Sequence, residues 1–220
     1  MGQGKRHGRA AMGFTVKSGW AAVVLLGGPA ASPRMLDARR LELSDPAIPE
    51  TRQPYHAGFG TARSSGPELS RLVASVERFG RRSVSGLIQH YTAEGHKFAG
   101  VGIVVGSLID PERIANGHIR IHALEGQLFR KVVEHGAGRS RLPCSIWRQR
   151  DLYARAAAIL KQPEPKLRVA LSVLRRPELG PWRAEQKAAA LAAWLVLAGR
   201  GRKNETIRRR HPNLQRVGIR

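Results

Sequence analysis

Two histidines and a glutamate, His118, His122 and Glu125, have a spacing that could bind a metal ion. The histidines lie four positions apart, so a helix would place both imidazoles on one face, as in helical zinc sites. However, no glutamate follows the first histidine directly, and Gly117 weakens the expectation of a helix at this point. We therefore predict no metal site from this spacing.

Cys144 is the only cysteine, which excludes an intramolecular disulfide and a cysteine-based zinc finger. It follows Pro143 in a short apolar run, where we expect a small buried hydrophobic residue rather than a nucleophile. The closely spaced glycines Gly100, Gly102 and Gly106 lie within a predicted strand instead of before a helix. The chain therefore has no phosphate-binding loop and no dinucleotide-binding motif.

Carboxylates are the remaining candidates for catalysis, and the three to consider are Glu185, Asp110 and Glu125. A metal-dependent nuclease needs several carboxylates around its divalent cations, because Mg²⁺ and Mn²⁺ take oxygen ligands. The chain has 16 acidic residues against 38 basic ones, and the apolar run 98–108 contains no acidic residue. We therefore expect no secure catalytic site and no cofactor. Mg²⁺ or Mn²⁺ would be required only if these carboxylates converge.

The elements that position these residues follow from apolar spacing. Residues 13–26 and 34–43 predict two strands of a β-hairpin, with the turn at Gly27-Gly28-Pro29. Residues 67–91 have the strongest helical spacing, with proline in the first turn. We then expect, in order, a strand at 98–108, a helix at 119–136, a strand at 142–147, and helices at 152–160, 166–175 and 181–198.

This order predicts an α/β fold in which a mixed sheet starts with a β-hairpin and helices pack on the sheet. A single domain, residues 12–199, is sufficient for all of these elements. Residues 1–11 are expected to form a basic N-terminal arm, and residues 200–220 a basic, disordered tail. Met12 is an alternative start, and a secretory signal ending near residue 32 is a weaker alternative to the strand.

The net charge of +22 predicts a polyanionic partner. We expect nucleic acid, RNA or duplex DNA, bound through its phosphates, because an aromatic content of 5% is low for a surface of stacked bases. The strongest candidates for phosphate contacts are the basic residues of the tail: Arg200, Arg202, Lys203, Arg208, Arg209 and Arg210. A second set lies on the first predicted helix: Arg71, Arg78, Arg81 and Arg82.

Two segments resemble the ribonuclease H-like superfamily, and its Holliday-junction-resolvase-like branch in particular. Gly13-Phe14-Thr15-Val16-Lys17-Ser18-Gly19 is similar to the first strand of that branch, and Glu185-Gln186-Lys187-Ala188-Ala189-Ala190-Leu191-Ala192 to its closing helix. The resemblance implies a ribonuclease H-like fold and a carboxylate site for two divalent cations. It implies an aspartate where this chain has Thr15, and Lys17 would repel a cation. The family's third hairpin strand is not evident, unless it lies in residues 51–60.

We therefore predict a non-catalytic, cytoplasmic, nucleic-acid-binding protein of ribonuclease H-like fold that contacts phosphates through basic arms. One alternative is a metal-dependent nuclease that uses Glu185 with Asp110 or Glu125. Another is a scaffold or assembly protein that binds an acidic protein partner. No apolar run is long enough to span a membrane, and association with a membrane surface is disfavoured because no strongly basic amphipathic helix is predicted.

Overall fold

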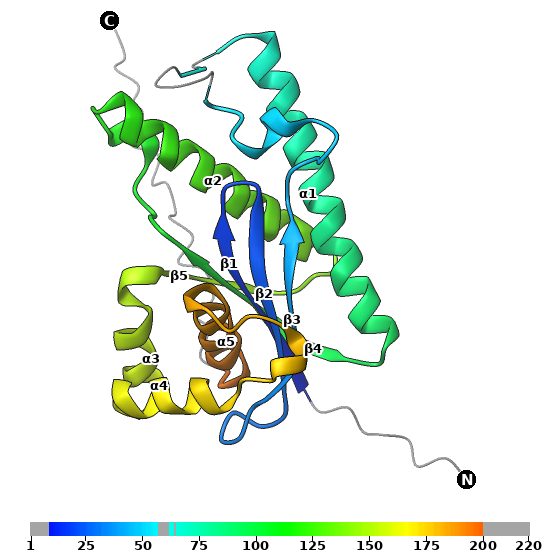
Figure 1. The fold of residues 1–220 in the computed structure, drawn as a ribbon, viewed down its shortest axis with the longest axis vertical. Helices are drawn as coiled ribbons and strands as arrows, with labels where there is room; N and C mark the ends of the chain where they lie inside the picture. The colour runs from blue at the N-terminus through cyan, green and yellow to red at the C-terminus, as the bar shows by residue number, and fades with distance from the viewer. Residues whose placement is uncertain (1–8, 57–61, 64, 200–220) are drawn as a thin grey trace, which may run out of the picture.

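The computed structural model describes residues 9–56, 62–63 and 65–199, and a five-stranded sheet forms its centre (Figure 1). The strand order is β3-β2-β1-β4-β5. The strands are β1 (Arg9–Lys17), β2 (Trp20–Gly27), β3 (Arg34–Glu42), β4 (Lys97–Val105) and β5 (Cys144–Arg148). β2 is antiparallel to both of its neighbours, whereas β1, β4 and β5 are parallel to one another. The predicted α/β class, with a mixed sheet that starts with a hairpin, is confirmed.

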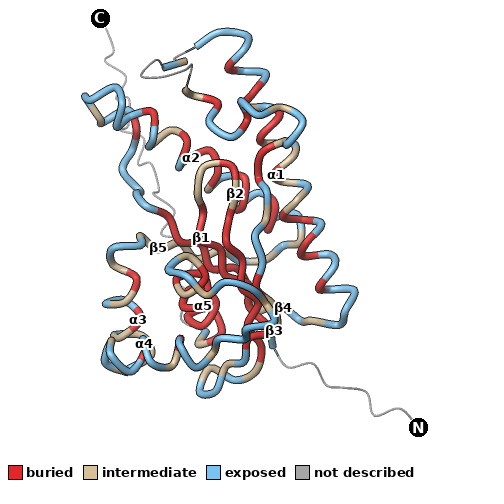
Figure 2. Tube along the Cα trace, in the orientation of Figure 1, coloured by how far each residue is buried: buried red, intermediate tan, exposed pale blue. Residues whose placement is uncertain are grey.

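Helices cover both faces of this sheet and form two separate hydrophobic cores. One face carries α1 (Pro67–Ala93) and α2 (Gly117–Gly138), and the other carries α3 (Leu152–Leu160), α4 (Glu164–Val173) and α5 (Ala184–Leu197). Four short 3-10 helices occupy the connections: η1 (Pro49–Arg52), η2 (Pro111–Arg113), η3 (Gln149–Asp151) and η4 (Pro177–Leu179). Buried residues are concentrated in the inner strands and in α5, as expected of a three-layer domain (Figure 2).

The prediction of one strand over residues 13–26 is wrong, because this stretch holds parts of β1 and β2 and the tight turn between them. Gly19 occupies the turn with φ of +81°, a conformation that favours glycine. Both strands are buried almost throughout, so the apolar sequence shows no alternation that would mark where one strand ends.

The third strand of the opening meander is β3, the segment 34–42, rather than residues 51–60. In that stretch residues 49–52 form η1, and residues 57–61 lie outside the described part of the chain. β3 is an edge strand and is only partly buried: Met35 and Ala38 belong to one core, while Leu36 and Leu41 pack against the other.

Two glycines allow α5 to lie directly on the sheet. A Cβ atom on Gly13 of β1 would come within 1.8 Å of the Ala189 carbonyl oxygen, and one on Gly102 of β4 within 2.7 Å of the Ala192 carbonyl oxygen. Such distances are shorter than any real contact, so these positions require glycine. This close packing places the N-terminus of α5 beside the carboxyl end of β1, where Thr15 donates a hydrogen bond to the Glu185 carbonyl.

Several predicted boundaries shift by a few residues. β1 begins at Arg9, so Ala10 and Ala11, expected in the N-terminal arm, are fully buried in the sheet. α2 begins at Gly117, because the Asn116 side chain accepts a hydrogen bond from the Ile119 backbone N–H at 3.0 Å and caps the helix. None of the described helices combines the length and apolar character that a membrane span requires.

Candidate functional site at the carboxyl end of the sheet

A pocket of about 930 Å³ opens where the carboxyl ends of β1 and β4 meet α2. Its wall includes residues 16–18 after β1, residues 105–110 after β4, and side chains of α2 such as His122 and Arg130. In open α/β sheets, ligands bind in the crevice beyond the carboxyl ends of the strands. The pocket therefore occupies the position where this class of fold carries its sites.

Thr15, Lys17 and Glu185 meet beside this pocket, at the contact between β1 and α5. Thr15 is 1% exposed, and its hydroxyl donates a hydrogen bond to the Glu185 backbone carbonyl at 2.8 Å. The Lys17 ammonium group lies 3.7 Å from the Glu185 carboxylate, and about a third of each side chain is exposed. Thr15 and Lys17 therefore lie on the same face of the strand.

These residues do not fit the two-cation site that the family resemblance implies. Thr15 is neutral and its hydroxyl already has an acceptor, while the carboxylate of Glu185 has an ammonium group as its counterion. The last residues of β4, Val104 and Val105, add no ligand. A cation at this position would lie close to the positive charge of Lys17, which opposes its binding.

The three candidate carboxylates are held by separate parts of the molecule. The Asp110 carboxylate accepts the Glu112 backbone N–H at 3.1 Å and caps η2 in the loop after β4. Glu185 lies in the first turn of α5 on one face of the sheet, whereas Glu125 belongs to α2 on the other face. In the described part of the chain, neither Asp110 nor Glu185 belongs to a group of three possible metal ligands.

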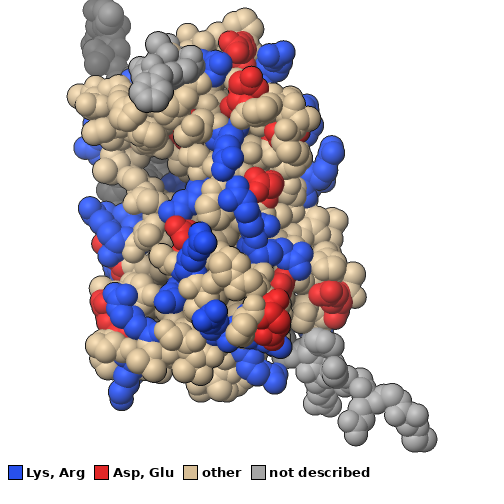
Figure 3. Space-filling view, in the orientation of Figure 1, with Lys and Arg blue, Asp and Glu red and all other residues tan. Residues whose placement is uncertain are grey.

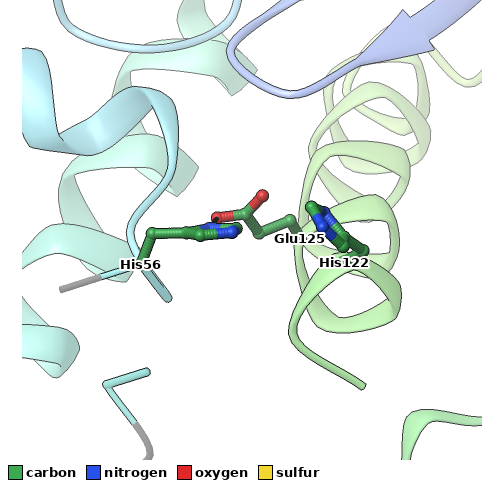
Figure 4. Close-up of side chains that lie close together, drawn as sticks. All are labelled: His56, His122 and Glu125. Carbon is green, nitrogen blue, oxygen red and sulfur yellow. Dashed lines mark hydrogen bonds and ion pairs between the residues drawn. The ribbon is translucent and has the colours of Figure 1, made fainter. Parts of the chain in front are cut away.

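Glu125 is fully buried and has two partners from other segments. Its Oε1 atom lies 2.8 Å from Nδ1 of His56, and its Oε2 atom accepts a hydrogen bond from the Ser18 hydroxyl at 3.3 Å. Ser18 lies in the turn between β1 and β2, and His56 follows η1. Figure 4 shows the Glu125 carboxylate between the rings of His56 and His122. The carboxylate thus joins three segments beneath the pocket.

His118, in the first turn of α2, lies beside His122 and outside the group of His56, His122 and Glu125. Its Nε2 atom lies 3.2 Å from Nε2 of His122, one turn along the same helix. The expectation that Gly117 would disfavour a helix here is wrong, and the helical spacing of the two histidines is realised. His56 is the member that sequence reasoning missed, because no spacing rule connects it to residues more than 60 positions away.

Burial changes the acidity of two groups near the site. Burial, and then the charges of Glu125 and Glu77, raise the pKa of the Tyr55 hydroxyl. Burial, and then the nearby Glu134 carboxylate, raise the pKa of the Cys144 thiol to about 12. A thiol with so high a pKa is a poor nucleophile at neutral pH. The sequence predicts a buried small hydrophobic residue at Cys144, whereas in the structure this residue is only half-buried.

The predicted phosphate-binding residues divide into two groups. The tail residues Arg200, Arg202, Lys203, Arg208, Arg209 and Arg210 lie outside the described residues, and their role stays a prediction. Arg71, Arg78 and Arg82 are exposed on α1, whereas Arg81 donates hydrogen bonds to the carboxylate and the backbone carbonyl of Glu77. Arg81 is therefore less available to a ligand than the other three.

Comparison with known proteins gives similar structures but no similar sequences. No family model matches the chain, and no curated protein does. The structure of Thermus thermophilus RuvC in complex with a Holliday junction substrate is similar with a TM-score of 0.49 and 11% identity, over 86% of this chain and 91% of that one. T. thermophilus RuvC alone gives 0.48 and 10%, over 84% and 92%. A ROK hexokinase from T. thermophilus gives 0.33 and 14%, over 67% of this chain and 38% of that one. At these identities the likeness shows the fold alone.

Proposed function

We propose that this protein binds nucleic acid through its phosphates and does not cleave it. The observation that carries the proposal is the Lys17–Glu185 ion pair beside Thr15, at the place where a nuclease of this fold would hold its metal ions. The protein's own ammonium group is the cation at this position. A domain with a lysine at this position can still bind nucleic acid on its surface, but it has no metal ions there to activate a water molecule for cleavage.

The distribution of charge supports a polyanionic partner. Most described carboxylates have a basic side chain within 4 Å, as in the pairs Arg148–Asp151, Arg168–Glu164 and Arg176–Glu178. Figure 3 shows this mixture on one face, where Asp and Glu lie among more numerous Lys and Arg side chains. The acidic residues therefore form no large patch on that face that would repel phosphates. The excess positive charge of the chain is left to attract a polyanion.

Helix α1 presents part of this excess as a stripe. Arg71, Arg78 and Arg82 are exposed at positions i, i+7 and i+11, which fall on one side of a helix. The stripe extends over about 16 Å at a rise of about 1.5 Å per residue. Guanidinium groups spaced along such a line suit the successive phosphates of a nucleic-acid backbone.

The experiment that tests the proposal is a salt titration of binding. The full-length protein and a form that ends at Gly199 are titrated with a four-way DNA junction, duplex DNA, structured RNA and a polyglutamate peptide. We expect the nucleic acids to bind more tightly than the peptide, with an affinity that falls steeply with salt. Removal of the tail, with seven more basic than acidic residues over 199–220, should lower the salt slope by several units.

Two results would contradict the proposal. Equal, weak binding of all four polyanions would mean that the positive charge of the protein attracts any polyanion and does not distinguish nucleic acid from an acidic peptide. Tighter binding of the peptide would favour the scaffold alternative, in which an acidic protein is the partner.

A further inference from the structure

We propose that His56, His122 and Glu125 bind a transition-metal dication of the Zn²⁺ class, and that the exposed His118 side chain turns to supply a fourth ligand. The site is separate from the proposed nucleic-acid interface and does not depend on it. It also differs from the family's carboxylate site, because Glu125 lies on the α2 side of the sheet and Glu185 on the α5 side.

The distances suit a tetrahedral ion. His56, His122 and Glu125 each bring a ligand atom to within 4.8 Å of the others. Zinc bonds to imidazole nitrogen of about 2.0 to 2.1 Å place tetrahedral ligand atoms about 3.3 Å apart. The separation of His56 Nδ1 from Glu125 Oε1 is 2.8 Å, and that of the His118 and His122 Nε2 atoms is 3.2 Å. His118 is not in the group that meets the 4.8 Å limit, so its exposed side chain must turn toward the ion to supply the fourth ligand.

The donor set selects the kind of metal. Three imidazole nitrogens and one carboxylate suit zinc and its neighbours, whereas Mg²⁺ and Ca²⁺ prefer oxygen ligands. Four protein ligands are the number found in structural zinc sites. We therefore infer a site that fastens the fold, and not one that supplies a metal-bound water.

The environment of Glu125 gives an independent reason for a cation. The side chain is fully buried, and a buried carboxylate is costly unless positive charge or hydrogen bonds compensate it. Its hydrogen-bond partners among the described residues are the His56 imidazole, at 2.8 Å, and the Ser18 hydroxyl, at the long distance of 3.3 Å. A bound dication would compensate this charge and join the segment after η1 to α2.

The location connects the site to the pocket. His122 and Ser18 both contribute to the pocket wall. His122 belongs to the group with Glu125, and Ser18 donates a hydrogen bond to the Glu125 carboxylate. Fastening His56 to α2 would therefore hold one side of the pocket in place. Metal binding would act on the shape of that pocket without taking part in a reaction there.

The experiment uses the untagged full-length protein after removal of metals with a chelator. Zn²⁺ binding is measured by calorimetry and by metal analysis after dialysis, with Mg²⁺ as the comparison ion. We expect one Zn²⁺ per chain and, at about 100 times the dissociation constant, a rise of about 5 to 10 °C in melting temperature. Mg²⁺ should give neither effect.

Variants assign the binding to these residues. His122→Ala and Glu125→Gln should each lower the affinity for Zn²⁺ at least about tenfold. His135→Ala is the matched control, because His135 is an exposed histidine of the same helix outside the cluster, and it should bind as the parent does. His122 is itself exposed, so its replacement is compatible with folding, which circular dichroism would verify.

Two results would overturn the assignment. The absence of a stoichiometric Zn²⁺ ion from the parent protein would remove the site. Binding that persists unchanged in both His122→Ala and Glu125→Gln would place the ion on histidines elsewhere in the chain.

Discussion

The ammonium group of Lys17 lies 3.7 Å from the carboxylate of Glu185, across the contact between β1 and α5. The two residues are 168 positions apart, and they meet because Gly13 and Gly102 let α5 pack closely on the sheet. A partly exposed ion pair adds little to stability, at most about 1 kcal/mol. The ion pair therefore matters for chemistry more than for stability, because it places positive charge where a nuclease would bind a metal ion.

The first prediction concerns cleavage. With Mg²⁺ or Mn²⁺ present, the protein should cut neither a four-way junction nor duplex DNA nor RNA, because Thr15, Lys17 and Glu185 leave no place for two cations. Gel analysis of labelled substrates measures this. Cleavage that disappears in Glu185→Gln would contradict the prediction and support the nuclease alternative.

The second prediction concerns the stripe on α1. Replacing Arg78 and Arg82 together by alanine should lower the slope of log affinity against log salt by about 2, one unit for each lost phosphate contact. The matched control replaces Arg81 and Arg168 by alanine. This removes the same amount of charge, but from arginines that already have carboxylate partners. If the two double variants lose equal amounts of affinity, only net charge matters and the stripe has no specific role.

The third prediction concerns the contact between α5 and the sheet. Gly13→Ala would force the Ala189 carbonyl and its helix away from β1, at a cost of about 3 kcal/mol in the free energy of unfolding. Gly86→Ala is the control, because Gly86 is exposed in α1 with open space around it. That substitution should stabilise the protein by about 0.5 to 1 kcal/mol, since alanine is the better helix former. Denaturant unfolding measures both, and equal effects of the two variants would refute the proposed close contact.

The fourth prediction concerns the pH dependence that arises from Cys144. The pKa of its thiol is about 12 in the folded protein against an ordinary value of 9.0. Between these values the unfolded chain has lost the proton and the folded chain has kept it, so the free energy of unfolding falls as pH rises from about 9 to about 12. Below that window the contribution of the thiol is fully present.

Cys144→Ala separates this effect from the tyrosines, which titrate in the same range. The difference in unfolding free energy between the parent and the variant should shrink as pH rises from about 9 to about 12. Thiol reagents should also react slowly with the folded parent at neutral pH. A pH-independent difference, together with fast labelling, would show that the thiol is exposed.

Much of the fold was predictable because it depends on local patterns. Helix α1 follows from apolar residues at helical spacing, with proline in its first turn and a glycine after its end. The order of helices and strands then restricts the possible topologies to an α/β sheet with crossovers. The turn between β1 and β2 escaped prediction because strands buried on both faces lack the alternation that marks strand ends.

The candidate site was predictable only in part. A neutral Thr15 and a cationic Lys17 in the segment that resembles the family's first strand already argued against a metal-dependent nuclease, because residue type and strand parity are properties of the chain itself. The meeting of Lys17 with Glu185, and of His56 with Glu125 and His122, is a matter of three-dimensional packing. Contacts between residues tens of positions apart depend on how the helices pack on the sheet, and no local spacing determines them. For Lys17 and Glu185, Gly13 and Gly102 permit that packing.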